Sequence, residues 1–400
     1  MEQLTGCYSS QRPAILTSAI LEPAPEPQPR SSLRQSSQMW LNWPDCYQLN
    51  RYIKSYSETG QTAYEVLHNF DRWPTWMWAN WEVAALAEWL RQYNQAHNQK
   101  VGFYGLDVYS LWESMRAIID YLEQTDPDAA SVARQAYMCF EPYGEDVQAY
   151  AWSTSLVPQT CEDEVIDLLM EIQRKAPQFP EEAEEAFNAV QNAMVTVNAE
   201  RYYRTMVRGG SDSWNLRDHH MVATLEQLMK HHGDRAKAIV WAHNTHIGDA
   251  RATDMAAAGM VNVGQLVREQ QIDHGVVLVG FGSHHGSVIA GQEWGAPMEK
   301  MRVSEARENS WEDLLSRAGS MNKLLILEDA RRLDEFFESR GHRAIGVVYH
   351  PGRERYGNYV PTILPYRYDA FLYIHETQAL HPLHVPADPG RPPETYPWGI

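Results

Sequence analysis

The stretch KAIVWAHNTHIGD, residues 237–249, is the part of the sequence that decides the fold. Its first six residues are mostly apolar and contain no turn residue, which is typical of a buried strand. The segment His243-Asn-Thr-His246 follows directly. In open α/β sheets, functional sites lie beyond the carboxyl ends of the strands. We therefore expect two imidazoles, three residues apart, at that edge of a sheet.

Further short apolar runs extend this pattern along the chain. We expect strands at 101–106, 275–283, 323–329, 343–350 and 369–376. Helical segments separate most of them, and short apolar strands that alternate with helices are typical of α/β proteins. The sequence therefore predicts an α/β fold with a largely parallel β-sheet core flanked by helices.

The helical parts differ in composition. Residues 126–206 are rich in Ala, Glu, Gln and Leu without strand signals, and we expect a helical insertion of several helices there. Residues 73–93 and 212–232 predict two further helices, the second capped by Ser211 or Asp212. Four tryptophans lie between residues 73 and 81. Such a cluster forms either plain core or the wall of a cleft, where Trp76 would contact an apolar substrate.

The two ends of the chain have a different composition. In residues 1–39, four prolines alternate with small or polar residues, and a Ser/Gln/Arg stretch follows. Such a segment cannot bury enough apolar surface to offset the entropy of ordering it, so we expect residues 1–39 to be disordered. Residues 386–400 form a Pro-rich tail. We expect one globular domain over residues 40–385.

Bulk properties limit the possible partners. The 400 residues carry a formal net charge of −18, with no Lys/Arg-rich run, which opposes binding to nucleic acid or to an anionic membrane. No apolar run reaches the ~18 residues that span a bilayer, and we recognise no signal peptide. The four cysteines form no CxxC pair, so we expect free thiols in a reducing cytoplasm.

Other polar residues are expected near the two histidines. The strand at 101–106 brings Asp107 to the same edge, and the strand at 275–283 leads to His285 in the Gly-flanked loop GFGSHHG. Asn244 lies between the two imidazoles. Arg217 and Asp218 form either a local ion pair or part of the site. Imidazoles and carboxylates gathered at one edge are suited to general acid–base catalysis.

Three interpretations of His243 and His246 stay open. They could share a proton transfer, or bind a metal with a third ligand such as Asp107 or His220. Alternatively, backbone carbonyls satisfy both rings and their role is structural. No Walker loop, dinucleotide fingerprint or GxSxG nucleophile motif occurs, so we expect no cofactor, with a metal not excluded.

Several segments together resemble the erythromycin esterase family. The most specific are WAHNTHIGDARATDMAAAGMVNVGQLVRE and RWPTWMWANWEVAALAEWLR, which span residues 241–269 and 72–91. Further matching segments lie at residues 43–53, 101–115, 202–221 and 356–377. The resemblance implies an α/β core with helical insertions around a deep cleft. It also implies hydrolysis of an ester or lactone by an activated water, with His243 and His246 matching the family's His-x-x-His.

The resemblance breaks at the start of the chain. The family has an earlier Gly-Glu-x-x-His-Gly motif, and a Glu at the end of the next strand, just before a WPD-like segment. With WPD aligned at residues 43–45, Trp40 stands where that Glu is expected, and residues 1–39 contain neither the motif nor the family's strand and helix. We therefore expect a truncated or altered N-terminal segment.

These features give one main functional hypothesis and two alternatives. The first is a cytoplasmic, macrolide-esterase-like hydrolase of a small ester or lactone, whose activity is impaired if the missing Glu/His motif is required. The second is an inactive relative that binds a ligand or a partner. The third is a metal-dependent hydrolase built on His243 and His246.

Overall fold

The structure is a computed structural model, and it describes most of the chain. The described residues are 14–18, 42–56, 61–143, 147–156, 160–175, 183–207, 210–233, 236–273 and 275–384.

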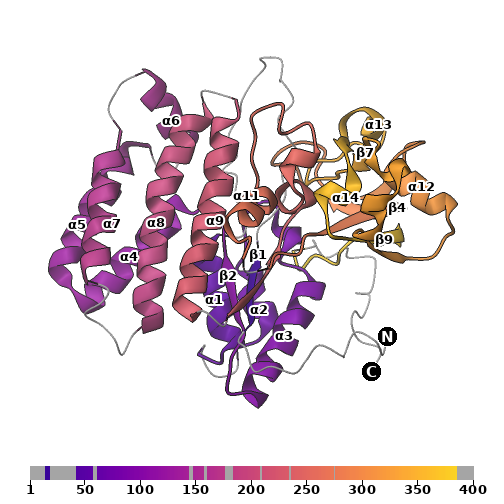
Figure 1. Cartoon of the computed structure of the whole chain (residues 1–400). Helices are drawn as coiled ribbons and strands as arrows, with labels where there is room; N and C mark the ends of the chain where they lie inside the picture. Colours follow the sequence, from indigo (N-terminus) through magenta and orange to yellow (C-terminus); the bar gives the residue numbers. More distant parts are fainter. Residues whose placement is uncertain are drawn as a thin grey trace, which may run out of the picture.

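A three-stranded parallel sheet lies at the centre of the molecule (Figure 1). Its strand order is β2-β1-β3, with β1 at Ala14–Ser18, β2 at Gly102–Gly105 and β3 at Lys237–Trp241. Both β2 and β3 lie where the sequence predicted strands. Ser18 pairs with Gly105 and Trp241, so the three strands end together at one carboxyl edge.

The strand β1 corrects the expectation that residues 1–39 contain no strand. A single strand is not stable alone in water, but β1 pairs along its length with a strand on either side. Backbone ladders to two neighbours override a weak local propensity. The predicted disorder of the rest of residues 1–39 lies outside the described residues, as does the predicted tail at 386–400.

A second sheet, of order β5-β4-β9-β6, is built from the C-terminal part of the chain. Its central pair, β4 (Val279–Ala290) and β9 (Ala370–Thr377), is parallel. The outer strands β5 (Glu299–Val303) and β6 (Lys323–Ile326) are antiparallel to them. The α/β class is thus confirmed, with parallel strands at the centre and a mixed second sheet.

The prediction of a strand at residues 343–350 was wrong. The strand there is β7 (Arg340–Arg343), which pairs with β8 (Tyr359–Thr362) in an antiparallel ladder. The apolar residues that follow are buried, with Val347 and Tyr349 among the core residues. Their backbone forms an isolated bridge around Gly291 and not a described strand, so burial rather than a ladder explains their composition.

Helices near the start of the described domain pack on β2 and build the largest apolar cluster. Asn42 caps the first of them, because its side chain accepts a hydrogen bond from the backbone N–H of Asp45. These elements are α1 (Trp43–Ile53), α2 (Ala63–His68), the 3₁₀ turn η1 (Thr75–Met77) and α3 (Trp81–Ala96).

The predicted helical insertion is observed as a bundle, drawn in purple and pink at the left of Figure 1, and its first helix begins before residue 126, the predicted start. The long helix α9 lies between this bundle and the sheet. The bundle comprises α4 (Leu111–Thr125), α5 (Pro127–Phe140), η2 (Glu141–Tyr143), α6 (Val147–Leu156), α7 (Glu162–Lys175) and α8 (Ala183–Met206), and α9 spans Asp212–His232.

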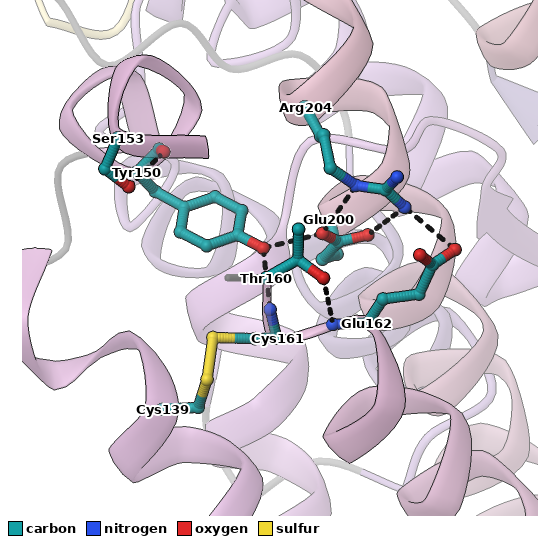
Figure 2. The surroundings of a disulfide bond; sticks show 8 residues. All are labelled: Cys139, Tyr150, Ser153, Thr160, Cys161, Glu162, Glu200 and Arg204. Atoms are coloured by element: carbon teal, nitrogen blue, oxygen red, sulfur yellow. Dashed lines mark hydrogen bonds and ion pairs between the residues drawn. A yellow bond between two sulfur atoms is a disulfide. The ribbon is translucent and has the colours of Figure 1, made fainter. Parts of the chain in front are cut away.

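A disulfide between Cys139 and Cys161 crosslinks this bundle and corrects the expectation of free thiols (Figure 2). The two cysteines are 22 residues apart, a spacing with no local signature. The fold brings the end of α5 beside the start of α7, where the Cα atoms lie 5.9 Å apart, within the range a disulfide requires. Disulfides are uncommon in a reducing cytosol, so this bond does not support the predicted cytoplasmic location. That location stays a prediction.

The remaining short elements follow β3 and surround the second sheet. They are α10 (Asn244–Ile247), η5 (Ala250–Ala252), α11 (Val263–Gln270), α12 (Trp311–Arg317), η6 (Asp329–Arg332), η7 (Asp334–Phe337), α13 (Glu354–Gly357) and α14 (Leu364–Arg367). Within the described ranges, no helix is long and apolar enough to span a bilayer.

Candidate active site

The candidate site is built where helix α9 meets the carboxyl ends of β2 and β3. Two consecutive residues of α9, Arg217 and Asp218, are both buried. Adjacent positions on a helix point about 100° apart, so the two side chains cannot share one partner easily. Arg217 turns toward the end of β2, and Asp218 turns toward the segment after β3.

Arg217 binds Asp107 through two charge-assisted hydrogen bonds. The Nε atom lies 3.0 Å from Oδ1 and Nη2 lies 2.8 Å from Oδ2. Both side chains are 1% exposed. A bidentate pair in a buried setting fixes both groups in position. Of the two alternatives for these residues, the local ion pair between Arg217 and Asp218 was therefore wrong, because each has a partner on a different strand end.

Asp218 forms a buried pair with His246. Its carboxylate oxygens lie 2.9 and 3.1 Å from His246 Nδ1, and Oδ1 also accepts the backbone N–H of Val263 at 2.9 Å. An ionised carboxylate only accepts hydrogen bonds, so His246 carries its proton on Nδ1. The lone pair is then on Nε2, which has no hydrogen-bond partner among the described residues.

The ring of His246 is also held from the side. The indole of Trp214 stacks on it, with ring centroids 4.5 Å apart and planes 8° from parallel. Trp214 Nε1 donates to the backbone carbonyl of Val261 at 2.7 Å. Because Asp218 fixes one nitrogen and Trp214 fixes the plane, the direction of Nε2 is set.

His243 has a different environment. It is the N-cap of α10, and its Nδ1 accepts the backbone N–H of Thr245 at 3.3 Å. The Thr245 hydroxyl lies 2.8 Å from the same nitrogen. Burial, together with the nearby His246 and Arg367, holds the pKa of His243 well below its usual value. His243 is therefore neutral at pH 7, and as the N-cap it stabilises the turn between the two histidines.

The turn itself is fixed by Asn244 and Asn262. The Asn244 side chain donates to the carbonyl of Phe281 at 2.6 Å and accepts its N–H at 3.1 Å, so it ties the turn to β4. The Asn262 amide donates to the carbonyls of Thr245, at 2.7 Å, and of Gly248. These bonds hold both histidines on a rigid backbone.

His220, one turn after Arg217 on α9, is buried beside Asp107. Burial lowers its pKa to about 4, although the charge of Asp107 and a hydrogen bond to the Asp107 backbone act in the opposite direction. His220 is therefore a neutral imidazole at pH 7.

Two of the predicted supporting residues lie in other surroundings. Trp76 is buried in the largest apolar cluster, in edge contact with Trp73. His285 lies within β4 and not in the expected loop, and its ring is beside those of His284 and His375, with centroids 5.3 and 5.1 Å away. Its Nε2 is 4.0 Å from a Glu376 oxygen. Their roles toward a substrate stay predictions.

The described part of the chain contains no group of three His, Cys, Asp or Glu side chains arranged to hold a metal ion. Asp107 is bound to Arg217, and Asp218 is bound to His246. Asp107, one of the third metal ligands proposed from the sequence, is thus engaged by a protein partner in this structure.

Sequence reasoning missed several residues of the site. Trp214 and Asn262 lie in helix starts, where their types are unremarkable. His342 and Glu312 are buried and touch the His243–His246 turn through Asn244. A single Glu in a short helix does not by itself indicate a functional site. Its partner His342 lies 30 residues away, so no local motif joins the two.

The fold and this carboxylate–imidazole site define an α/β protein with a site at the carboxyl edge of a parallel sheet. The erythromycin esterase family matches residues 41–377, and the chain belongs to that family. The match begins directly after residue 40, so residues 1–40 lie outside it.

Solved structures show the same fold at low sequence identity. A succinoglycan biosynthesis protein is 19% identical, with 92% of this chain and 81% of that chain covered and a TM-score of 0.64. A protein from Bacillus cereus is 17% identical, with coverage of 94% and 83% and a TM-score of 0.66. An erythromycin esterase mutant in an open conformation is 13% identical, with coverage of 93% and 84% and a TM-score of 0.58.

Proposed function

We propose that the chain hydrolyses a carboxylic ester or lactone with a water molecule that His246 activates. The observation that carries this proposal is the buried Asp218–His246 pair, whose Nε2 has no hydrogen-bond partner among the described residues. Membership of the erythromycin esterase family supports an esterase-like reaction and, as the substrate class, a macrolide lactone.

The reaction balances with the groups at hand. His246 Nε2 takes a proton from water as the oxygen attacks the carbonyl carbon. Asp218 stabilises the imidazolium that forms, because its carboxylate already accepts a hydrogen bond from Nδ1–H. The tetrahedral intermediate then breaks its bond to the alcohol oxygen, and the proton on Nε2 passes to that leaving oxygen. The products are a carboxylic acid and an alcohol, joined in one molecule when the substrate is a lactone.

Other predicted residues support this centre. The Arg217–Asp107 pair anchors α9 to the end of β2 and so fixes Asp218, the next residue. His243 and Asn244 hold the turn that carries His246. We keep Trp76 and His285 as candidates for contact with the substrate.

The test is hydrolysis of erythromycin, followed by mass spectrometry as a gain of one water, together with hydrolysis of an activated ester. We expect turnover that falls by ~10²–10⁴-fold in His246→Gln. A wild-type rate in folded His246→Gln would overturn the proposal.

Two other outcomes identify the alternatives. Binding of the macrolide, seen as a change in tryptophan fluorescence without turnover, would favour the inactive binding relative. Activity lost in a chelator and restored by Zn²⁺ would favour the metal-dependent hydrolase.

A further inference from the structure

A second carboxylate–imidazole pair lies beside the His243–His246 turn. Glu312 of α12 and His342 of β7 are both buried, and Glu312 Oε1 lies 2.5 Å from His342 Nδ1. The same oxygen accepts the backbone N–H of Arg343 at 3.0 Å. Gly282 of β4 leaves room for this carboxylate, because a Cβ there would lie 3.0 Å from Oε1 and 2.5 Å from the ring of Phe371.

The carboxylate of Glu312 determines which nitrogen of His342 carries the proton. Since a carboxylate accepts, Nδ1 donates and Nε2 keeps its lone pair. Burial lowers the pKa of His342, and Arg367 also lowers it, whereas Glu312 acts in the opposite direction. His342 is therefore a neutral ring whose Nε2 accepts hydrogen bonds.

The Nε2 atom of His342 faces the middle of the turn. It lies 3.3 Å from Asn244 Nδ2 and 3.2 Å from the hydroxyl of Tyr368. Asn244 Nδ2 has two protons, and the other goes to the carbonyl of Phe281. The Phe281 carbonyl and His342 Nε2 thus accept one proton each from Asn244 Nδ2 in hydrogen bonds, and together they fix the plane of the amide.

The fixed Asn244 side chain also fixes the backbone turn that carries His246. Asn244 is the first residue of α10, between His243 and His246, and its own carbonyl accepts Arg367 Nη2 at 3.1 Å. A rotated Asn244 amide would lose its paired bonds to Phe281, and the turn would lose its attachment to β4.

We infer that Glu312 and His342 are positioning residues, which orient Asn244 and through it the His246 ring. This inference rests on the proposed function, because it concerns the geometry of the same hydrolytic centre. It predicts that the link from His342 to Asn244, rather than the burial of His342 alone, determines catalytic rate.

Two matched substitutions separate these effects. In His342→Asn the amide lies near the position of Nδ1, so it can still donate to Glu312 but does not reach Asn244. In His342→Gln the amide reaches the position of Nε2 and can accept from Asn244. Tyr150→Phe is a control for general stability, because it removes a buried hydroxyl that binds Glu200 at 2.6 Å in the distant helical insertion.

We expect kcat for an activated ester to fall by ~10–100-fold in His342→Asn, with KM within about twofold, because small misplacements of a catalytic group are costly. His342→Gln should recover most of that loss, and Tyr150→Phe should lower only the melting temperature. Equal rates in His342→Asn and His342→Gln would overturn the inference.

A second readout does not need activity. Long-range ¹H–¹⁵N spectra of ¹⁵N-histidine-labelled protein report the tautomer of each ring, and His246→Gln assigns the His246 signals. We expect a single Nδ1–H form of His246 in the wild type and in His342→Gln, and a shifted or averaged pattern in His342→Asn.

The two readouts separate the failure of each idea. If the wild type shows no hydrolysis, the proposed function fails, while the spectra still decide whether His342 positions His246. A His246 pattern that is unchanged in folded His342→Asn would reject the positioning role even if the enzyme is active.

Discussion

At the scale of single residues, the two histidines of the His-x-x-His segment differ in what contacts Nδ1. At His246, Asp218 accepts a hydrogen bond from Nδ1–H, which leaves Nε2 as the basic atom. At His243, Nδ1 accepts the backbone N–H of Thr245 as a helix cap. The two histidines thus differ in which ring nitrogen can act as a base, because their hydrogen-bond partners select different tautomers.

This difference predicts how substitutions at the two positions behave. His246→Gln should lower kcat for an activated ester by ~10²–10⁴, the usual effect of losing a general base. His243→Asn should keep most of the activity, because Asn is a good N-cap and preserves the turn. His243→Ala removes the cap and should cost about 1 kcal/mol of stability. Rates and melting temperatures of the three variants provide the measurement.

A loss of hydrolysis in well-folded His243→Asn equal to that in His246→Gln would contradict this division of roles. It would mean that His243 also transfers a proton, as the sequence alone allowed.

At the scale of elements, α9 shows what a sequence pattern predicts and what it does not. Its extent, residues 212–232, follows from the sequence, and the structure agrees at both ends. The partners of Arg217 and Asp218 do not follow, because they lie 110 and 28 residues away. Local spacing favoured an ion pair between neighbours, whereas packing of α9 against two strand ends selected separate partners.

The strand β1 shows the opposite error. The segment AILTS has β-branched residues but lies in a Pro- and Ser-rich context, and composition over 39 residues predicted disorder. Composition averages over a window, whereas β1 depends on nine backbone pairings with β2 and β3, four and five respectively. Such pairings connect residues more than 80 positions apart and are invisible to local patterns.

A proline at Leu16 should therefore destabilise the whole sheet. Leu16 pairs with Phe103 on one side and with Ile239 on the other. Proline removes a ladder hydrogen bond and is rarely tolerated in a central strand. We expect Leu16→Pro to lower the melting temperature by several degrees, measured by calorimetry, while Ser18→Thr at the strand end should not. An unchanged melting temperature in Leu16→Pro would mean that β1 does not stabilise the sheet.

The disulfide makes an independent prediction for the helical bundle. It closes a loop of 22 residues between α5 and α7. Crosslinking a loop of that length stabilises a protein by about 3 kcal/mol, mainly by restricting the unfolded chain. We expect Cys139→Ser with Cys161→Ser to unfold at lower denaturant concentration than the wild type, with a similar effect from a reductant.

Thiol alkylation tests the bond itself. Under denaturing conditions without reductant, Cys46 should react, because it is outside the disulfide, whereas Cys139 and Cys161 should not. Reaction of Cys139 and Cys161 in the unreduced protein would show that they are free thiols, as the sequence had suggested.

At the scale of the whole molecule, strand and helix periodicity predicted the α/β class, the helical insertion and the edge at which the site lies. The periodicity placed Asp107 and His246 near the same end of the sheet, and α9 does link them there. It did not predict Glu312 or His342, because they lie on α12 and β7, far along the chain from the histidine turn, and His342 meets that turn only by tertiary contact with Asn244. Periodicity places a residue at a strand end, whereas hydrogen-bond geometry depends on tertiary packing.

Two global properties act on acid stability in opposite directions. The net charge of −18 causes self-repulsion that weakens as carboxylates gain protons. The buried neutral imidazoles oppose this gain, because they must take up a proton on unfolding. Both His220 and His243 have a pKa below that of an unfolded histidine. Below pH 6.5 the unfolded state therefore binds more protons than the folded state, and these histidines make the protein less stable as the pH falls.

His220 isolates this effect, because burial lowers its pKa from 6.5 to about 4. Its contribution to stability is complete above pH 6.5 and is lost as the pH falls from 6.5 to 4. A pKa shift of that size corresponds to about 3 kcal/mol over the full window, and to about 2 kcal/mol at pH 5.

The variant His220→Gln should lack this loss of stability. The free energy of unfolding of the wild type should therefore fall more steeply between pH 7 and pH 5 than that of His220→Gln, as measured by urea denaturation. The charge repulsion and the His243 contribution are common to both proteins and cancel in the difference. Parallel pH profiles for the two proteins would mean that His220 is protonated in the folded state, and that its contact with Asp107 outweighs its burial.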